Sequence, residues 1–118
     1  MRLWMVDPST MCRQHLLGEH CECHMFYGAM KKGTKMDGYV NKHYLEVRSL
    51  QKRHDDLAIE LVNRGYNHKS PLIVESCVLD SLSDFVRNSL MNEHMGMVDL
   101  HTRCNECRIK YQKYANLS

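Results

Sequence analysis

Apolar side chains recur every three or four residues along most of the chain, which is the spacing of one face of an α-helix. Alternating runs of β-branched residues, which are typical of strands, are scarce. The pattern predicts four helices, at residues 11–29, 41–64, 76–91 and 98–114. We therefore expect an all-α fold, a compact single domain of three to four helices over residues 1–118.

Capping residues mark the expected ends of these helices. Ser9 or Thr10, following Pro8, can cap the first helix, and Gly65 suits the left-handed position after the second. Gly96 is expected to end or kink the third helix. No repeat or low-complexity segment interrupts the chain, which agrees with one domain.

The same spacing predicts which side chains point toward the core. The second helix has an apolar stripe made of Val47, Leu50, Leu57, Ala58 and Leu61. The inward residues of the third helix are Leu79, Leu82, Phe85, Val86 and Leu90. The last helix has one face made of Leu100, Cys104, Cys107, Tyr111 and Tyr114.

Composition excludes some classes of protein. The chain is 43% hydrophobic and 25% charged, as globular proteins are. No apolar run approaches the roughly 18–20 residues of a membrane span, so no membrane partner is expected. The N-terminus reaches Asp7 and Pro8 too early for a signal peptide, and we expect an intracellular protein with reduced cysteines.

Charge is uneven along the chain. Residues 31–69 carry nine basic and five acidic side chains, and residues 102–118 carry four and one. Between them, residues 70–101 carry one and five. A basic middle and a basic tail indicate a face for a polyanion. An ordinary solvated surface of mixed charge would give the same counts.

A polar row runs along the first predicted helix. His15, Glu19, Glu22 and Phe26 are spaced four, three and four residues apart and share a face. An imidazole and two carboxylates on one stripe can perform acid–base chemistry, because neighbouring charges separate their pKa values. The alternative is the solvent-exposed face of an ordinary helix.

The cysteines allow two interpretations. Cys104 and Cys107, with His101 before them, form half of a possible zinc site. The other half could come from the first helix, where the candidates are His20, Cys21, Cys23 and His24. However, Cys21 and Cys23 are two residues apart and point to different sides of a helix. We therefore expect buried core thiols and no metal or other cofactor.

The tail interleaves basic and aromatic residues, namely Lys110, Tyr111, Lys113 and Tyr114. This pattern suits contact with a nucleic-acid backbone and stacking on bases. It is equally the pattern of an amphipathic helix end, with tyrosine inward and lysine outward.

Two stretches of the chain match the order of a known family's motifs. The first contains Gln14-His15-Leu16, Glu19, Glu22 and Gly28-Ala29. The second contains Lys52-Arg53, Leu57, Glu60-Leu61 and Arg64-Gly65-Tyr66-Asn67. Over residues 1–69 the chain resembles the phage pyrimidine-dimer DNA glycosylases, also called UV endonuclease V.

The resemblance implies an all-helical DNA repair enzyme that cleaves the glycosidic bond of a cyclobutane pyrimidine dimer and nicks the strand through a linked AP-lyase step. It implies an N-terminal α-amine as the nucleophile, which falls on Met1, and an essential glutamate, which falls on Glu22. Arg2 matches the arginine after the nucleophile, and its bulk should keep Met1 in place. α-Amines have an ordinary pKa of about 7.7–8.0, so they are far better nucleophiles at neutral pH than lysine side chains.

The resemblance also gives expectations for DNA contact. Two family arginines that flank the glutamate fall on Cys21 and Met25, so other cations must contact phosphates. The candidates for phosphate contact are Arg13, Lys31, Lys32, Lys35, Arg48, Lys52 and Arg53. Further expected contacts come from Arg2, Gln14, Glu19 and the tail, and His15 joins Met1 and Glu22 as a catalytic candidate.

The expected partner is double-stranded damaged DNA, bound by a monomer with the target base extruded from the helix. The resemblance leans toward a phage-encoded protein that acts inside a bacterial host. Three alternatives remain open: a glycosylase for a different modified base, a non-catalytic DNA-binding protein, and a helical interaction module held by zinc.

Overall fold

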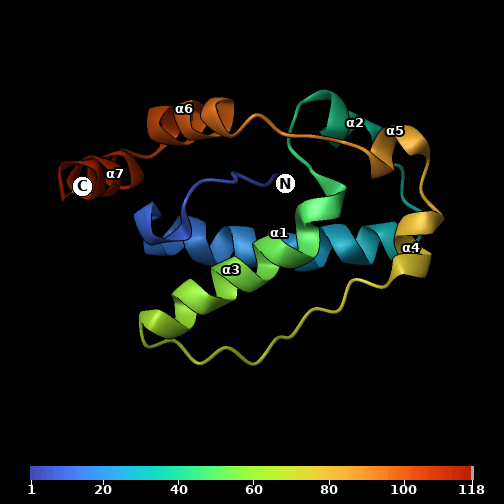
Figure 1. Cartoon of the computed structure of the whole chain (residues 1–118), viewed down its shortest axis with the longest axis horizontal. Coiled ribbons are helices and arrows are strands. Elements are labelled where there is room, and N and C mark those ends of the chain that lie inside the picture. Colours follow the sequence, from blue (N-terminus) through green and yellow to red (C-terminus); the bar gives the residue numbers. More distant parts are fainter. Residues whose placement is uncertain (118) are drawn as a thin grey trace.

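A computed structural model describes residues 1–117 and contains no strand within them (Figure 1). The all-helical prediction is confirmed, but the described chain forms seven α-helices instead of three to four. They are α1 (Arg13–Lys31), α2 (Asp37–Asn41), α3 (Leu50–Asn63), α4 (Ser76–Asp80), α5 (Asp84–Arg87), α6 (Glu93–Arg103) and α7 (Asn105–Leu117). Two short 3-10 helices, η1 (Pro8–Thr10) and η2 (Val47–Ser49), precede α1 and α3.

The core lies where α1 and α3 cross near the middle of the molecule (Figure 1). Leu16 and Phe26 of α1 and Leu57 of α3 are fully buried there. The apolar stripe predicted for the second helix is confirmed, because Val47, Leu50, Leu57 and Leu61 are buried and Ala58 is half-buried. Gly65 has a φ of 91°, and the N–H of Tyr66 donates to the Leu61 carbonyl at 3.0 Å, which confirms the predicted left-handed end of α3.

The second predicted helix is too long at its start. Residues 41–46 do not continue into α3, because α2 ends at Asn41 and His43 adopts a φ of 61°, which no α-helix accommodates. The segment after α2 instead pairs with the N-terminus, where the Leu3 N–H donates to the Tyr44 carbonyl at 2.8 Å. This pairing holds the first residues of the chain in place.

The third predicted helix is broken into two short ones. α4 ends at Asp80, and α5 begins again after Ser83, whose hydroxyl accepts from the Val86 N–H at 3.3 Å. Because α5 stops at Arg87, the helical spacing fails beyond it, and Leu90 is 75% exposed instead of inward. Phe85 is also exposed, at 52%, and Val86 is the buried residue of α5.

The last predicted helix is also two helices, which meet at Cys104. This residue is extended, with φ −128° and ψ 105°, so the face expected to run on to Tyr114 is interrupted. Gly96 lies inside α6 and does not end a helix. A Cβ atom there would lie 2.4 Å from the Trp4 carbonyl oxygen, so glycine is required for α6 to reach the N-terminal segment.

The molecule is elongated, with extents of 43 × 30 × 21 Å. α7 lies at one end of the long axis, and α4 and α5 lie at the other (Figure 1). Within the described residues, no helix is long and apolar enough to cross a membrane.

Candidate functional site

The N-terminal segment is fixed by the side chain of Arg2. Its guanidinium lies 3.9 Å from the Trp4 ring centre and 4.2 Å from that of Tyr44, and it pairs with Asp99 of α6 at 3.1 Å. The sequence predicted that Arg2 contacts DNA, but its side chain is buried and is not available for that contact. Its effect is to set the position of Met1, the residue before it.

Glu22 lies on α1 close enough to the N-terminus for the two to interact electrostatically. Burial raises the pKa of the Glu22 carboxyl group, and the positive α-amine of Met1 opposes part of that rise. The Arg2 backbone N–H also stabilises the charged form. A half-buried carboxyl group beside an amine is an arrangement suited to proton transfer near neutral pH.

A cavity of about 270 Å³ opens beside the Met1 residue. Its other walls come from Lys35 before α2, from Gly38, Tyr39 and Lys42, and from Tyr44. Two ammonium groups and two phenol rings can attract a phosphate and stack on a base or sugar. Sequence reasoning missed Tyr39, Lys42 and Tyr44, although lysine and tyrosine alternate from residue 35 to 44 as they do in the tail.

The polar row of α1 does not form one site. Glu19 is buried and accepts from Arg53 of α3, with its Oε1 2.9 Å from Nη2. The Arg53 Nη1 also donates to the Val6 carbonyl at 2.6 Å. Both residues were expected to contact DNA, and the structure corrects this, because each is buried and paired with the other. Phe26 belongs to the core, and among the residues of this row Glu22 interacts with the amine.

Most of the remaining residues expected to contact DNA are accessible. The exposed residues of this group are Arg13, Gln14, Lys31, Lys32, Lys35, Arg48, Lys52 and Lys113. Lys52 is paired with Asp56 at 2.6 Å, and Arg48 with Asn88. In the tail, Lys110 and Tyr111 are half-buried and Tyr114 is 49% exposed. The tail lies at the α7 end of the molecule, so it does not join the cavity at Met1 (Figure 1).

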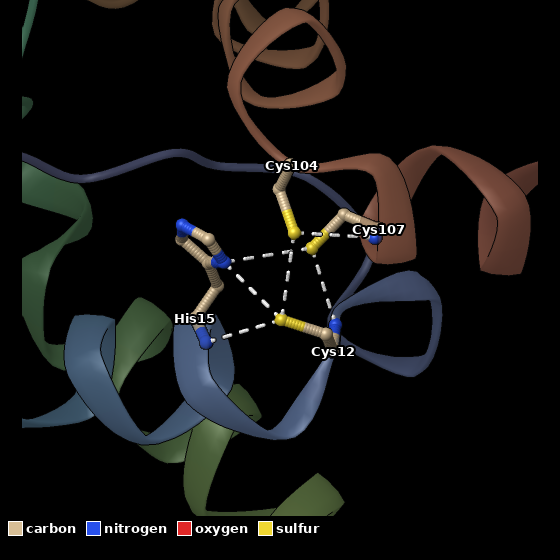
Figure 2. A group of neighbouring side chains, drawn as sticks. All are labelled: Cys12, His15, Cys104 and Cys107. Carbon is tan, nitrogen blue, oxygen red and sulfur yellow. Dashed lines mark hydrogen bonds between the residues drawn. The ribbon is translucent and has the colours of Figure 1, made fainter.

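Four side chains converge between the start of α1 and the junction of α6 with α7 (Figure 2). We call this group the Cys3His cluster, and its members are Cys12, His15, Cys104 and Cys107. Their sulfur and nitrogen atoms all lie within 4.8 Å of one another. Cys104 and Cys107 therefore lie beside Cys12 and His15. The partners considered from the sequence, at residues 20–24, do not belong to this group. The sequence signal that was missed is that Cys12 and His15 have two residues between them, as Cys104 and Cys107 do.

A second cluster contains only imidazoles and lies between α1, α3 and the loop after α3. His20 Nε2 is 2.9 Å from His68 Nε2, and the ring centres of His20 and His54 are 4.8 Å apart. Burial first, and then the neighbouring imidazoles, lower the pKa of His20 to about 4. A larger cavity, of about 450 Å³, lies beside His54 and His68 with mainly apolar walls. It is separate from the cavity at Met1, since the two share no residue.

Comparison with known proteins defines the class and then the family. Residues 1–74 match a family model of DNA glycosylases, which are enzymes of DNA repair. This model is described as pyrimidine dimer DNA glycosylase, and because it covers more than half of the chain, the protein belongs to that family. Membership supports pyrimidine-dimer DNA glycosylase activity in general and the binding of damaged DNA. Searches of curated proteins and of solved structures found no match.

Proposed function

We propose that the protein cleaves the glycosidic bond of one base of a pyrimidine dimer in duplex DNA through the α-amine of Met1 and then nicks the strand. The observation that carries this proposal is the electrostatic interaction of the Met1 amine with the Glu22 carboxyl group, together with a cavity at Met1 lined by lysine and tyrosine. The family match over residues 1–74 includes both residues.

In the first step, the amine nitrogen attacks C1′ of the damaged nucleotide. The C1′–N bond to the pyrimidine breaks. The base keeps the bonding electron pair, takes up a proton and stays joined to the neighbouring pyrimidine through the cyclobutane ring. The nitrogen then loses a proton, and its lone pair forms a C1′=N double bond as the C1′–O4′ bond of the sugar breaks. O4′ takes up a proton, and the product is a Schiff base between Met1 and the ring-opened sugar. Glu22 orients the amine and stabilises the positive charge that develops on the sugar.

In the second step, Glu22 accepts the proton from C2′ of the Schiff base. The electrons of that C–H bond form a double bond and expel the 3′ phosphate, which nicks the strand. A carboxyl group with a raised pKa is better matched to this transfer at neutral pH than an ordinary glutamate.

Lys35 and Lys42 supply positive charge at the cavity. The positions of the two family arginines on α1 are occupied by Cys21 and Met25, which carry no positive charge. We propose that these lysines bind the phosphates beside the lesion. Each phosphate contact steepens the fall of affinity with salt, by a slope of about 0.9 per contact in duplex DNA.

Borohydride trapping tests the proposal. Wild-type protein is incubated with a duplex that carries one thymine dimer, with an abasic duplex and with undamaged DNA. We expect a covalent adduct on the first two, lost when two residues are added before Met1. Glu22→Gln should slow the reaction by about 10²- to 10⁴-fold.

The other outcomes separate the alternatives. Trapping on the abasic duplex alone would point to a different modified base, and no adduct on any duplex would leave a non-catalytic DNA-binding protein. The double variant Lys35→Ala/Lys42→Ala should bind DNA with a shallower salt dependence, whereas Lys69→Ala, an exposed lysine away from the cavity, serves as the matched control.

A further inference from the structure

The Cys3His cluster has the donor atoms and the geometry of a tetrahedral metal centre (Figure 2). Around a zinc ion with Zn–S bonds of about 2.3 Å, two sulfurs of a regular tetrahedron lie about 3.8 Å apart. The sulfurs of Cys12 and Cys104 are 3.8 Å apart. The His15 Nδ1 lies 3.2 Å from the Cys12 sulfur and 3.8 Å from that of Cys107.

The backbone around the cluster also favours thiolates. Cys12 is the N-cap of α1, and its sulfur accepts from the His15 N–H at 3.4 Å. Cys104 stands in the same relation to α7, where its sulfur accepts from the Cys107 N–H at 3.4 Å. The Cys12 N–H in turn donates to the Cys107 sulfur at 3.2 Å. Such donors stabilise negative charge on sulfur, which is the form that binds metal.

Packing of neutral thiols explains these facts less well. A buried core cysteine needs no other sulfur or imidazole beside it, and among the described residues Cys23 of α1 belongs to no group of possible metal ligands. The members of the cluster instead direct three sulfurs and an imidazole nitrogen toward one point (Figure 2). Arg13, Arg103 and Arg108 adjoin these residues in the chain, so the segments that carry the cysteines also carry positive charge.

We propose that the Cys3His cluster binds one zinc ion with a structural role. Four protein ligands fill the tetrahedron and leave no position for water or substrate, as in structural zinc sites. Binding replaces the thiol protons, which pass to solvent, and involves no oxidation or reduction. His15 is then a zinc ligand, and it does not act in acid–base chemistry at Met1.

The consequence of the site is a link between two parts of the chain. One pair of ligands starts α1, and the other lies at the junction of α6 and α7, beyond the residues that the family model matches. The ion therefore attaches the C-terminal helices to the matched region. α6 in turn contacts Trp4 and Arg2, so the attachment supports the segment that carries Met1. The zinc proposal stands whether or not the glycosylase proposal does.

The test measures metal in the full chain, purified without chelators. Elemental analysis and native mass spectrometry should find one zinc ion per chain. Cobalt(II) exchanged into the site should show sulfur-to-cobalt charge-transfer bands together with the strong visible bands of tetrahedral cobalt. Removing a ligand should weaken zinc binding by more than about 100-fold, since even changes outside the ligand set cost 10- to 100-fold.

The variants are Cys104→Ser and Cys107→Ser, with Cys21→Ser and Cys77→Ser as matched controls because both control residues are exposed. The controls should keep one zinc ion per chain. If the ligand variants fail to fold, the zinc content and cobalt spectrum of the wild type still decide. Absence of zinc, a disulfide within the cluster, or cobalt bands without a sulfur contribution would overturn the proposal. The last result would place the ion at the His20, His54 and His68 cluster instead.

Discussion

The two halves of the molecule are stabilised in different ways. Residues 1–74 contain most of the buried apolar side chains, whereas in the described residues after them only Val86, Leu100 and Cys107 are buried and apolar. The first half can therefore hold itself together through its core. The second half cannot form a core of its own, and it depends on particular links to the first: a glycine contact, an ion pair and the Cys3His cluster.

This difference predicts that damage to the first half unfolds the whole protein, whereas damage to a link frees the C-terminal helices.

The buried pair of Glu19 and Arg53 should be the most sensitive point of the first half. Arg53→Met leaves Glu19 buried without a partner, and loss of one member of such a pair costs about 3–5 kcal/mol. The free energy of unfolding from urea denaturation measures the effect. The double variant with Glu19→Leu should recover much of it, since both charges are then gone. Lys52→Met, which removes an exposed pair, should change stability by less than about 1 kcal/mol.

Removal of zinc should loosen the second half and spare the first. A bound ligand at a thousandfold excess over its Kd contributes about 4 kcal/mol to the folded state. We expect a chelator to lower Tm and to increase amide hydrogen exchange in α6 and α7, with α1 and α3 still protected. Equal loss of protection in α1 and α3 would show that the two halves are not separable.

Gly96→Ala should displace α6 from the N-terminal segment. The added methyl group meets the Trp4 carbonyl oxygen, which belongs to the backbone, and such overpacking costs about 1–3 kcal/mol. Gly18→Ala is the matched control, because Gly18 lies in α1 and a Cβ atom added there would meet no neighbouring group within 4 Å. This change should stabilise the protein by about 0.5–1 kcal/mol. Thermal unfolding of the two variants distinguishes a close contact from a general effect of glycine.

The histidine cluster should make stability fall with acid. The pKa of His20 is lowered from 6.5 to about 4 by burial and by His54, His24 and His68, while Asp55 contacts His54. Between these pH values the unfolded chain binds more protons than the fold, so the free energy of unfolding decreases as pH falls from about 6.5 to about 4. One such group contributes at most about 1.4 kcal/mol per pH unit.

Denaturation of chelator-treated protein between pH 7 and 5 measures this effect without a contribution from metal release. His20→Asn should flatten the dependence. His43→Asn, at an exposed position whose positive φ asparagine tolerates, should leave it unchanged. An unchanged slope in the His20 variant would assign the acid sensitivity to other groups.

The sequence predicted the first half better than the second for a physical reason. α1 and α3 are long enough for their apolar spacing to define a face, and Gly65 marks the end of α3 by a conformation that few other residues adopt. The helices after residue 75 are mostly short, and their ends depend on local caps such as Ser83. The apolar spacing of three and four residues therefore predicted continuous helices across breaks that this spacing does not reveal.

The site was predicted in part for a similar reason. Spacing placed Glu22 on a face of α1, but it gave the same face to Glu19 and His15, which the fold assigns to a buried ion pair and to the Cys3His cluster. Tyr39 reaches the cavity from α2, and Lys42 and Tyr44 reach it from the turn after α2, which depends on the left-handed conformation of His43. Partners distant in the chain decide these roles, and a local pattern carries no information about them.

The ion pair between Arg2 and Asp99 joins two residues that are far apart in the order of synthesis. Asp99 is synthesised 97 residues after Arg2. Chains generally fold from the N-terminus as they emerge. Arg2 can form this pair only after α6 has been synthesised, so a shortened product that lacks α6 would leave the Arg2 side chain without its acidic partner.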